Sequence, residues 1–126
     1  NELRTTGSYT APSGITDAQG DWSNAAFWLA AAKDTHKITL NGLSLSSQPD
    51  RRVLELLSEM GMKIETHGDS VCASAPERTH GILFDASGIP DLVPILCVRA
   101  AVSKGATVIA ACGSRRATVY KPSAVC

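Results

Sequence analysis

Two prolines restrict where a helix can begin in the segment Asp85–Leu96, "DASGIPDLVPIL". A proline inside a helix removes a hydrogen bond and clashes with the preceding turn, so Pro94 must lie in the first turn of the apolar helix that follows. Pro90 favours an extended conformation at Ile89, which a helix interior excludes. The helix is therefore predicted to start close to Asp91, with this carboxylate at or beside the N-cap, where the helix dipole favours an anion.

Hydrophobic periodicity predicts an alternation of helices and strands along the rest of the chain. The three expected helices cover Asn24–Ala32, the segment from Pro49 up to Gly61, and Leu92–Ser103. The first of them, capped by Asp21 or Ser23, is apolar on nearly every side and is expected to be buried. Strands are expected in "HKITLNGL", "MKIET", "SVCAS", "GILFD" and "ATVIAA", the second and third of which read as a hairpin. This order predicts an α/β (α+β) fold.

A weak internal sequence similarity suggests that this pattern is repeated. "AAFWLAAA…KITLNG" resembles "LVPILCVRAAVSKGATVIAACG", each an apolar helix, a break and a strand, at an offset longer than the roughly 20–50 residues of solenoid repeats. This internal similarity predicts βαβαββ-type units, of which one full unit and the start of a second fit in this chain. Residues 1–19 are expected to form a poorly ordered lead-in, 20–113 a partial lobe with its core between Asp21 and Ala111, and 114–126 an irregular tail.

Composition excludes several classes of function. The formal net charge is zero and aromatic residues make up 5% of the chain, which argues against nucleic acids and anionic membranes as partners. The longest apolar run, Ala25–Ala32, is far shorter than the roughly 20 residues of a membrane span. The polar segment Asn1–Tyr9 lacks the apolar core of a signal peptide, so a cytoplasmic location is expected.

The cysteines and histidines do not suggest a metal site. None of the cysteines forms a CxxC pair, and the histidines do not stand at zinc-ligand spacing from them. We expect three cysteines to be packing residues and Cys126 to be a tail thiol, with no disulfide framework and no metal. The seven residues concerned are Cys72, Cys97, Cys112, Cys126, His36, His67 and His80.

The residues alone leave the role of the carboxylates open. Asp91 can be a plain helix cap or a carboxylate fixed in place for chemistry, Asp85 an ordinary strand-end residue and Asp21 an ordinary cap. No GxSxG, P-loop or HExxH motif is present to define another catalytic set.

Three blocks of sequence add to this reading: "GDWSNAAFWLAAA", "SQPDRRVLELLSEMGMKIE" and "DASGIPDLVPILCVRAAVSKGAT". They closely resemble the 3-phosphoshikimate 1-carboxyvinyltransferase (EPSP synthase) family, from Gly20 to about Gly113. The resemblance implies a longer protein of two lobes built from βαβαββ units, in which this chain opens the second lobe. It implies transfer of the enolpyruvyl group of phosphoenolpyruvate to the 5-hydroxyl of shikimate 3-phosphate in aromatic amino-acid biosynthesis. It also implies no cofactor, and glyphosate as a competitor of phosphoenolpyruvate.

The resemblance assigns two site residues. The Asp of the family's IPD motif falls on Asp91, where it would bind the shikimate hydroxyls and act as the base for the attacking 5-hydroxyl. Arg116 matches the first, substrate-binding position of an Arg-x-Lys-Glu-x-x-Arg signature, but Thr118, Val119 and Pro122 stand where its Lys, Glu and last Arg are expected. The family's first-lobe contacts also have no counterpart. We therefore expect the isolated chain to be inactive without the missing lobe as its partner.

Two alternatives stay open at the level of sequence. The first is the sister enolpyruvyl transferase acting on UDP-N-acetylglucosamine, which shares the fold. The second is a non-catalytic binding or assembly module on the same scaffold, favoured by the incomplete signature after Arg116 and by the apolar helix Asn24–Ala32, which would need a covering partner.

Overall fold

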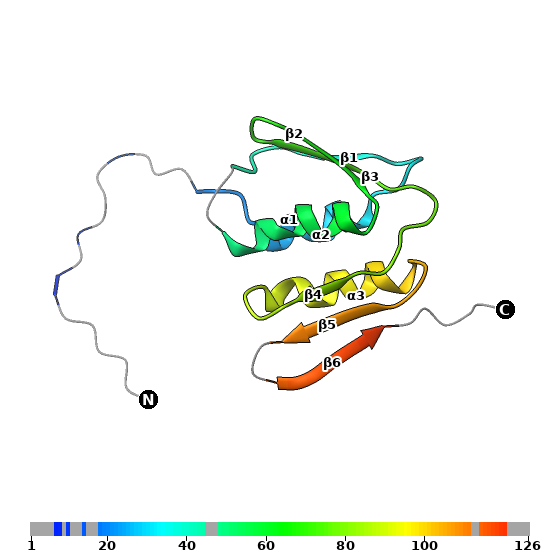
Figure 1. Ribbon diagram of the computed structural model, residues 1–126. Helices are drawn as coiled ribbons and strands as arrows, with labels where there is room; N and C mark the ends of the chain where they lie inside the picture. The colour runs from blue at the N-terminus through cyan, green and yellow to red at the C-terminus, as the bar shows by residue number, and fades with distance from the viewer. Residues whose placement is uncertain are drawn as a thin grey trace.

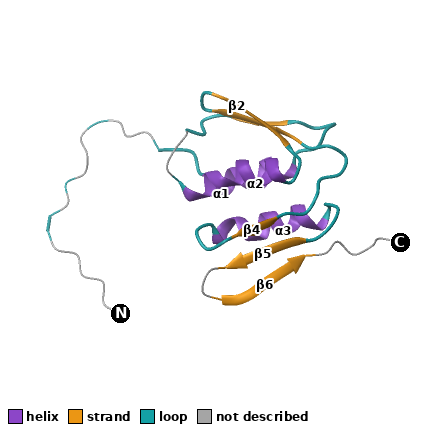
Figure 2. Cartoon of the chain, in the orientation of Figure 1, coloured by secondary structure: helices purple, strands orange, loops and turns teal. Residues whose placement is uncertain are grey.

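The helices of the molecule lie between two three-stranded sheets, with two helices beside the first sheet and one beside the second (Figure 1). The computed structural model describes residues 7, 8, 10, 14, 18–44, 48–111 and 114–120. Helices α1 (Trp22–Ala31) and α2 (Val53–Glu59) lie against the first sheet, and α3 (Val93–Ala101) lies against the second (Figure 2). The predicted α/β fold is confirmed.

The first sheet has the order β1-β3-β2, formed by Ile38–Leu40, Ser70–Ser74 and Lys63–His67. The central strand β3 is antiparallel to both neighbours, so β1 and β2 run in the same direction with α2 as their connection. Strands β2 and β3 form the predicted hairpin. Alternation along β3 turns Val71 and Ala73 into the core beneath α1.

The second sheet has the order β4-β5-β6, formed by Leu83–Asp85, Thr107–Ala111 and Ser114–Tyr120. Strands β4 and β5 are parallel and are joined by α3, which packs on β5 as the crossover helix of a βαβ unit. Strand β6 pairs antiparallel with β5, with a register shift between Ile109 and Ala111.

The irregular tail expected over 114–126 is wrong for its first seven residues, which form β6. Periodicity disappears there because a strand on the edge of a sheet need not alternate apolar and polar residues. The unpaired edge of β5 supplies the backbone partners, and Thr118, Val119 and Tyr120 are residue types that favour strands. Most of the expected lead-in 1–19, together with Cys112, Pro122 and Cys126, lies outside the described residues.

The helix boundaries follow local chemistry. Asp21 caps α1, as one of the two predicted candidates, by accepting a hydrogen bond from the backbone N–H of Ser23. A 3₁₀ turn, η1 (Pro49–Arg52), opens the second helix and runs directly into α2. Gly61 ends this helix with φ at +92°, in the left-handed region that favours glycine.

The expectation that the first helix is buried all round is wrong. Trp22 and Leu29 are fully buried, but Phe27 and Trp28 keep 58% and 63% of their surface exposed. Helix α1 packs against the first sheet on one side and against α3 on another. No described element covers its remaining side, where Phe27 and Trp28 stand.

Among the residues whose burial is described, the hydrophobic core lies between the layers and includes residues from Trp22 to Ile109. It joins α1 and α2, the inner faces of both sheets, and the buried face of α3. Within the described residues, no helix has the length and hydropathy that a membrane crossing requires.

Candidate functional site

Three helical segments begin at one edge of the molecule, where strand β4 also ends (Figure 1). These are α1, η1 and a second 3₁₀ turn, η2 (Pro90–Leu92), which leads into α3. Both 3₁₀ turns contact α1. We call this edge the rim and define it by residues 20–24, 48–52 and 85–91.

Gln48 ties the start of α1 to the start of η1. Its side-chain oxygen accepts from the backbone N–H of Trp22 at 3.2 Å, and its side-chain nitrogen donates to the carbonyl of Gly20 at 3.2 Å. The indole N–H of Trp22 donates to the carbonyl of Ser44, also at 3.2 Å. The rim is thus built on a buried tryptophan and a bidentate glutamine.

Two of the rim carboxylates are engaged in holding the rim together. Asp21 accepts from the backbone N–H of Ser23 at 2.9 Å and from the side-chain amide of Asn24. Asp50 of η1 accepts from the hydroxyl of Ser23. These contacts give both aspartates a structural role as caps and cross-links.

The loop between β4 and η2 is fixed in the same manner. The Asp85 carboxylate accepts from the backbone N–H of Ser87 at 2.9 Å and from its hydroxyl, which closes a turn on the loop itself. The N–H of Ala86 donates to the carbonyl of Ala110 at 2.8 Å, and the N–H of Ile89 donates back to Ala86 at 3.1 Å. The loop therefore has little freedom to move relative to β5.

Asp91 differs from these carboxylates. It lies in η2 between Ile89 and Leu92, whose side chains are 2% and 0% exposed and anchor the turn in the core. The Asp91 side chain is itself exposed, and in the described part of the chain its carboxylate forms no hydrogen bond or ion pair. A carboxylate held by a rigid turn and left open to solvent is available to an incoming ligand.

The predicted N-cap role of Asp91 is only approximate. Ile89 occupies the cap position of η2 and Leu92 that of α3, and neither helical segment has a side-chain cap. The extra 3₁₀ turn moves the start of α3 to Val93, so Asp91 lies within the first helical turn. Pro94 does fall in the first turn of α3, as predicted.

The other predicted site residue, Arg116, lies on β6 near the same end of the second sheet. Its strand pairs with β5, where Ala111 is opposite Ser114, and on the other side of β5 Ala110 is opposite Asp85. The backbone of Arg116 is therefore separated from the end of β4 by a single strand. The loop that carries Asp91 follows β4 directly.

One rim residue was missed by sequence reasoning. Arg52, in the last position of η1, donates from a guanidinium nitrogen to the carbonyl of Asp85 at 3.1 Å and joins two of the rim segments. Together with Arg51 it places exposed positive charge beside the loop of Asp91. The signal in the sequence was the pair of arginines that follows Pro49 and Asp50 at the start of a helix.

The described residues offer no metal centre, because no cluster of His, Cys, Asp and Glu lies among them. Cys72 and Cys97 are free and half-buried, which agrees with a packing role. Burial raises the pKa of the Cys97 thiol, so this residue is kept from the thiolate form that a nucleophile needs.

Comparison with known proteins gives a consistent match in sequence. A family model described as EPSP synthase (3-phosphoshikimate 1-carboxyvinyltransferase) matches residues 1–122. A 3-phosphoshikimate 1-carboxyvinyltransferase of Clostridium acetobutylicum is 47% identical over 92 residues, which are 72% of this chain and 21% of the relative. One of Methanococcoides burtonii is 40% identical over 103 residues, 80% of this chain and 22% of the relative. The chain thus spans about a fifth of the length of these relatives.

Solved structures show the same fold. The enolpyruvyl transferase NikO from Streptomyces tendae matches with a TM-score of 0.60 at 20% identity, over 78% of this chain and 25% of that one. The EPSP synthase from Acinetobacter baumannii matches with a TM-score of 0.55 at 22% identity, over 72% of this chain and 24% of that one.

Proposed function

The chain belongs to the EPSP synthase family, and we propose on this premise that it forms part of an enolpyruvyl transferase. The enzyme moves the carboxyvinyl group of phosphoenolpyruvate to the 5-hydroxyl of shikimate 3-phosphate, in the cytoplasm, and releases phosphate. The observation that supports this proposal most directly is the environment of the Asp91 carboxylate. Among the rim aspartates of the described structure, it alone is held by buried neighbours and is itself unengaged.

Asp91 has the chemistry of a general base for a hydroxyl group. An ionised carboxylate can accept the hydrogen bond of the 5-hydroxyl and take its proton as the oxygen bonds to C2 of phosphoenolpyruvate, while the electron pair of the C2=C3 double bond takes up a proton at C3. Loss of a proton from C3 then restores the double bond as phosphate leaves C2. Fixing the turn through Ile89 and Leu92 lowers the entropy lost when the substrate is oriented. Such a base contributes about 10²–10⁴-fold to the rate of a proton-transfer step.

Positive charge must accompany this base, because both substrates are phosphorylated. Arg116 is the proposed substrate-binding cation, and Arg51 and Arg52 add charge at the rim. The rest of the cationic set would come from the remaining polypeptide, because Thr118 and Pro122 stand where the resemblance implies a Lys and an Arg. For this reason we propose that the isolated chain does not turn over.

The test is a chimera in which residues 20–113 of this chain replace the matching segment of the Clostridium acetobutylicum relative, so that the Lys, Glu and last Arg of the family signature come from the relative. We expect the chimera to release phosphate from phosphoenolpyruvate only when shikimate 3-phosphate is present, and to give no such release with UDP-N-acetylglucosamine. Asp91→Asn, which keeps the size of the side chain but removes the base, should lower kcat by about 10²–10⁴-fold.

Glu65→Gln provides the matched control, because Glu65 is an exposed carboxylate on β2 with no place at the rim. This variant should keep full activity. A chimera that folds but does not transfer the carboxyvinyl group would refute the proposed function. An Asp91→Asn chimera as active as Glu65→Gln would refute the role given to Asp91.

A further inference from the structure

The last turn of η1 and the loop that carries Asp91 meet at an open edge of the second sheet. Strand β4 is an outer strand of that sheet and, among the described strands, pairs with β5 alone. The N–H of Ala86, just beyond β4, donates to the carbonyl of Ala110 on β5 at 2.8 Å. Because the C=O and N–H of a trans peptide point in opposite directions, the carbonyl of Asp85 faces away from β5, toward the open edge.

Arg52 supplies the hydrogen-bond donor at this edge. Its guanidinium donates to the Asp85 carbonyl at 3.1 Å. The peptide unit between Asp85 and Ala86 is therefore held by β5 on one side and by η1 on the other. A guanidinium stays charged over the whole range of working pH, so this contact does not switch with pH. The start of the loop is thus fixed from two directions.

A series of turn hydrogen bonds carries this fixed point forward to Asp91. The N–H of Ile89 donates to the carbonyl of Ala86 at 3.1 Å, and the N–H of Leu92 donates to the carbonyl of Ile89 at 3.1 Å. Between them, Pro90 restricts the backbone to a φ of about −65°. A shift of the first peptide of the loop must therefore move the turn that carries Asp91.

The neighbouring Arg51 does not share this contact. Successive side chains of a 3₁₀ helix point about 120° apart, since it has three residues per turn, so Arg51 and Arg52 point in different directions from η1. Both are exposed, and in the part of the chain that the structure describes the Arg51 side chain forms no hydrogen bond or ion pair. Comparing the two arginines therefore separates the loss of a charge from the loss of a contact.

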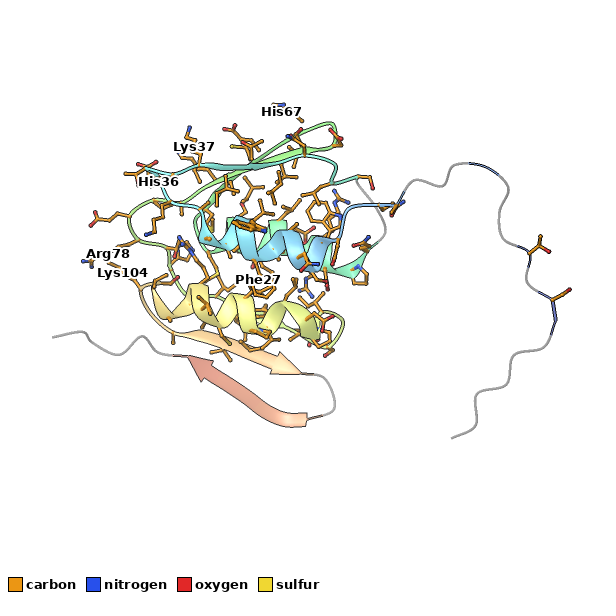
Figure 3. All side chains as sticks on the ribbon, turned by 180° about the vertical axis from the view of Figure 1, so that it is seen from behind. Phe27, His36, Lys37, His67, Arg78 and Lys104 are labelled. Carbon is orange, nitrogen blue, oxygen red and sulfur yellow. The ribbon has the colours of Figure 1, made fainter. Side chains whose placement is uncertain are left out.

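A second group of basic side chains lies at the end of the molecule opposite the rim. Figure 3 shows His36, Lys37, Arg78 and Lys104 there. Lys37 follows the end of α1, whereas the rim contains its start, and its side chain is exposed. One positive charge can therefore be removed at Lys37 without a change at the rim.

We propose that Arg52 is a positioning residue for the transfer reaction, which acts through the Asp85 carbonyl to set the place of the Asp91 carboxylate. In this role Arg52 does not touch the substrate. Its contact keeps the loop at one distance from η1, so the carboxylate is already oriented when the 5-hydroxyl arrives. A misplacement of about 1 Å at such a group costs up to about 10²-fold in rate. The proposal rests on the proposed function for the reaction that Asp91 serves.

The first test compares Arg52→Met, Arg51→Met and Lys37→Met in the chimera with the Clostridium acetobutylicum relative. Each variant loses one positive charge and keeps an apolar stem, but only Arg52→Met loses the contact with Asp85. With both substrates saturating, its single-turnover rate should lie at least about tenfold below those of the other two variants. The Kd for shikimate 3-phosphate should differ by less than about threefold between the two rim variants, because both lose the same charge. Equal rates for the rim variants would overturn the proposal, and so would a loss in Arg52→Met confined to Kd, which marks a direct contact with substrate.

Hydrogen exchange on the 126-residue chain, read by mass spectrometry, tests the positioning of the loop without turnover. The peptide that covers residues 85–92 should exchange at least about threefold faster in Arg52→Met than in Arg51→Met, whereas the peptide that covers β2 and β3 should exchange equally in both. Equal exchange at 85–92 would overturn the role of Arg52. Faster exchange in every peptide would also overturn it, because Arg52 would then stabilise the whole fold and not one loop. A folded but inactive chimera refutes the proposed function, and the exchange result still decides whether Arg52 positions the loop.

Discussion

The two tryptophans of the chain offer a matched test of how the rim is held. Trp22 is fully buried at the start of α1, and its indole N–H donates to the carbonyl of Ser44 at 3.2 Å. Trp28 lies on the same helix but is 63% exposed. Replacing each by phenylalanine removes the same atoms from two very different environments.

The magnitude expected for Trp22→Phe follows from two losses. The carbonyl of Ser44 loses its donor, which costs about 1–3 kcal/mol when the group stays buried. The smaller ring leaves a cavity against the core, for which we take about 1 kcal/mol by analogy with the removal of a single buried methyl group. The free energy of unfolding should therefore fall by about 2–4 kcal/mol, a large fraction of the roughly 5–15 kcal/mol of a typical domain. Trp28→Phe should change it by less than about 0.5 kcal/mol.

Urea unfolding followed by far-UV circular dichroism measures both values on the 126-residue chain. We expect the free energy of unfolding of Trp22→Phe to lie well below that of Trp28→Phe and that of the wild type. If the two variants unfold at the same urea concentration, Trp22 does not hold α1 to the segment around Ser44, and the rigid rim inferred above is incorrect.

Two further predictions concern local packing and pH. Gly81→Ala should lower the free energy of unfolding by about 1–3 kcal/mol, because the added Cβ would lie 2.2 Å from the carbonyl oxygen of Ala106. Gly88→Ala, which has open space around its Cβ, should be neutral or slightly stabilising. Equal unfolding midpoints for the two variants would contradict the close contact at Gly81. Burial raises the pKa of the Cys97 thiol in the folded chain, so the unfolded chain loses this proton at a lower pH. The contribution of Cys97 to the free energy of unfolding therefore declines as pH rises above about 8.5, the model-peptide pKa of a thiol. Its alkylation by iodoacetamide should accordingly be slower than that of glutathione at pH 8, and an equal or faster rate would contradict the burial.

Much of the fold could be predicted because local signals agreed with the tertiary structure. Pro94 located the first turn of α3, and the apolar stripe after Pro49 located α2. The strand β6 could not be predicted in this way, since its partner is the edge of β5 and not a pattern of its own. The exposure of Phe27 was also unpredictable, because hydrophobicity alone does not say which neighbours a helix has.

The position of Asp91 at the start of a helix could be predicted, whereas its surroundings could not. The prolines and the resemblance both led to Asp91, but the cap position assigned to it ignored the 3₁₀ turn that precedes α3. The link from Arg52 to Asp85 depends on residues 33 positions apart that only the fold brings together. Likewise, Asp21 and Asp91 look equivalent as aspartates near helix starts, and only the hydrogen bonds separate the cap from the unengaged carboxylate.

The most direct test of the role of Asp91 is a single-turnover measurement on the chimera with the Clostridium acetobutylicum relative. With shikimate 3-phosphate and phosphoenolpyruvate saturating, the rate of the chemical step in Asp91→Asn should fall at least about 100-fold, while the Kd for shikimate 3-phosphate changes by less than about tenfold. This separation is expected of a base that is held in place by Ile89 and Leu92 and is not itself part of the scaffold. An unchanged chemical step, or a loss confined to binding, would contradict it.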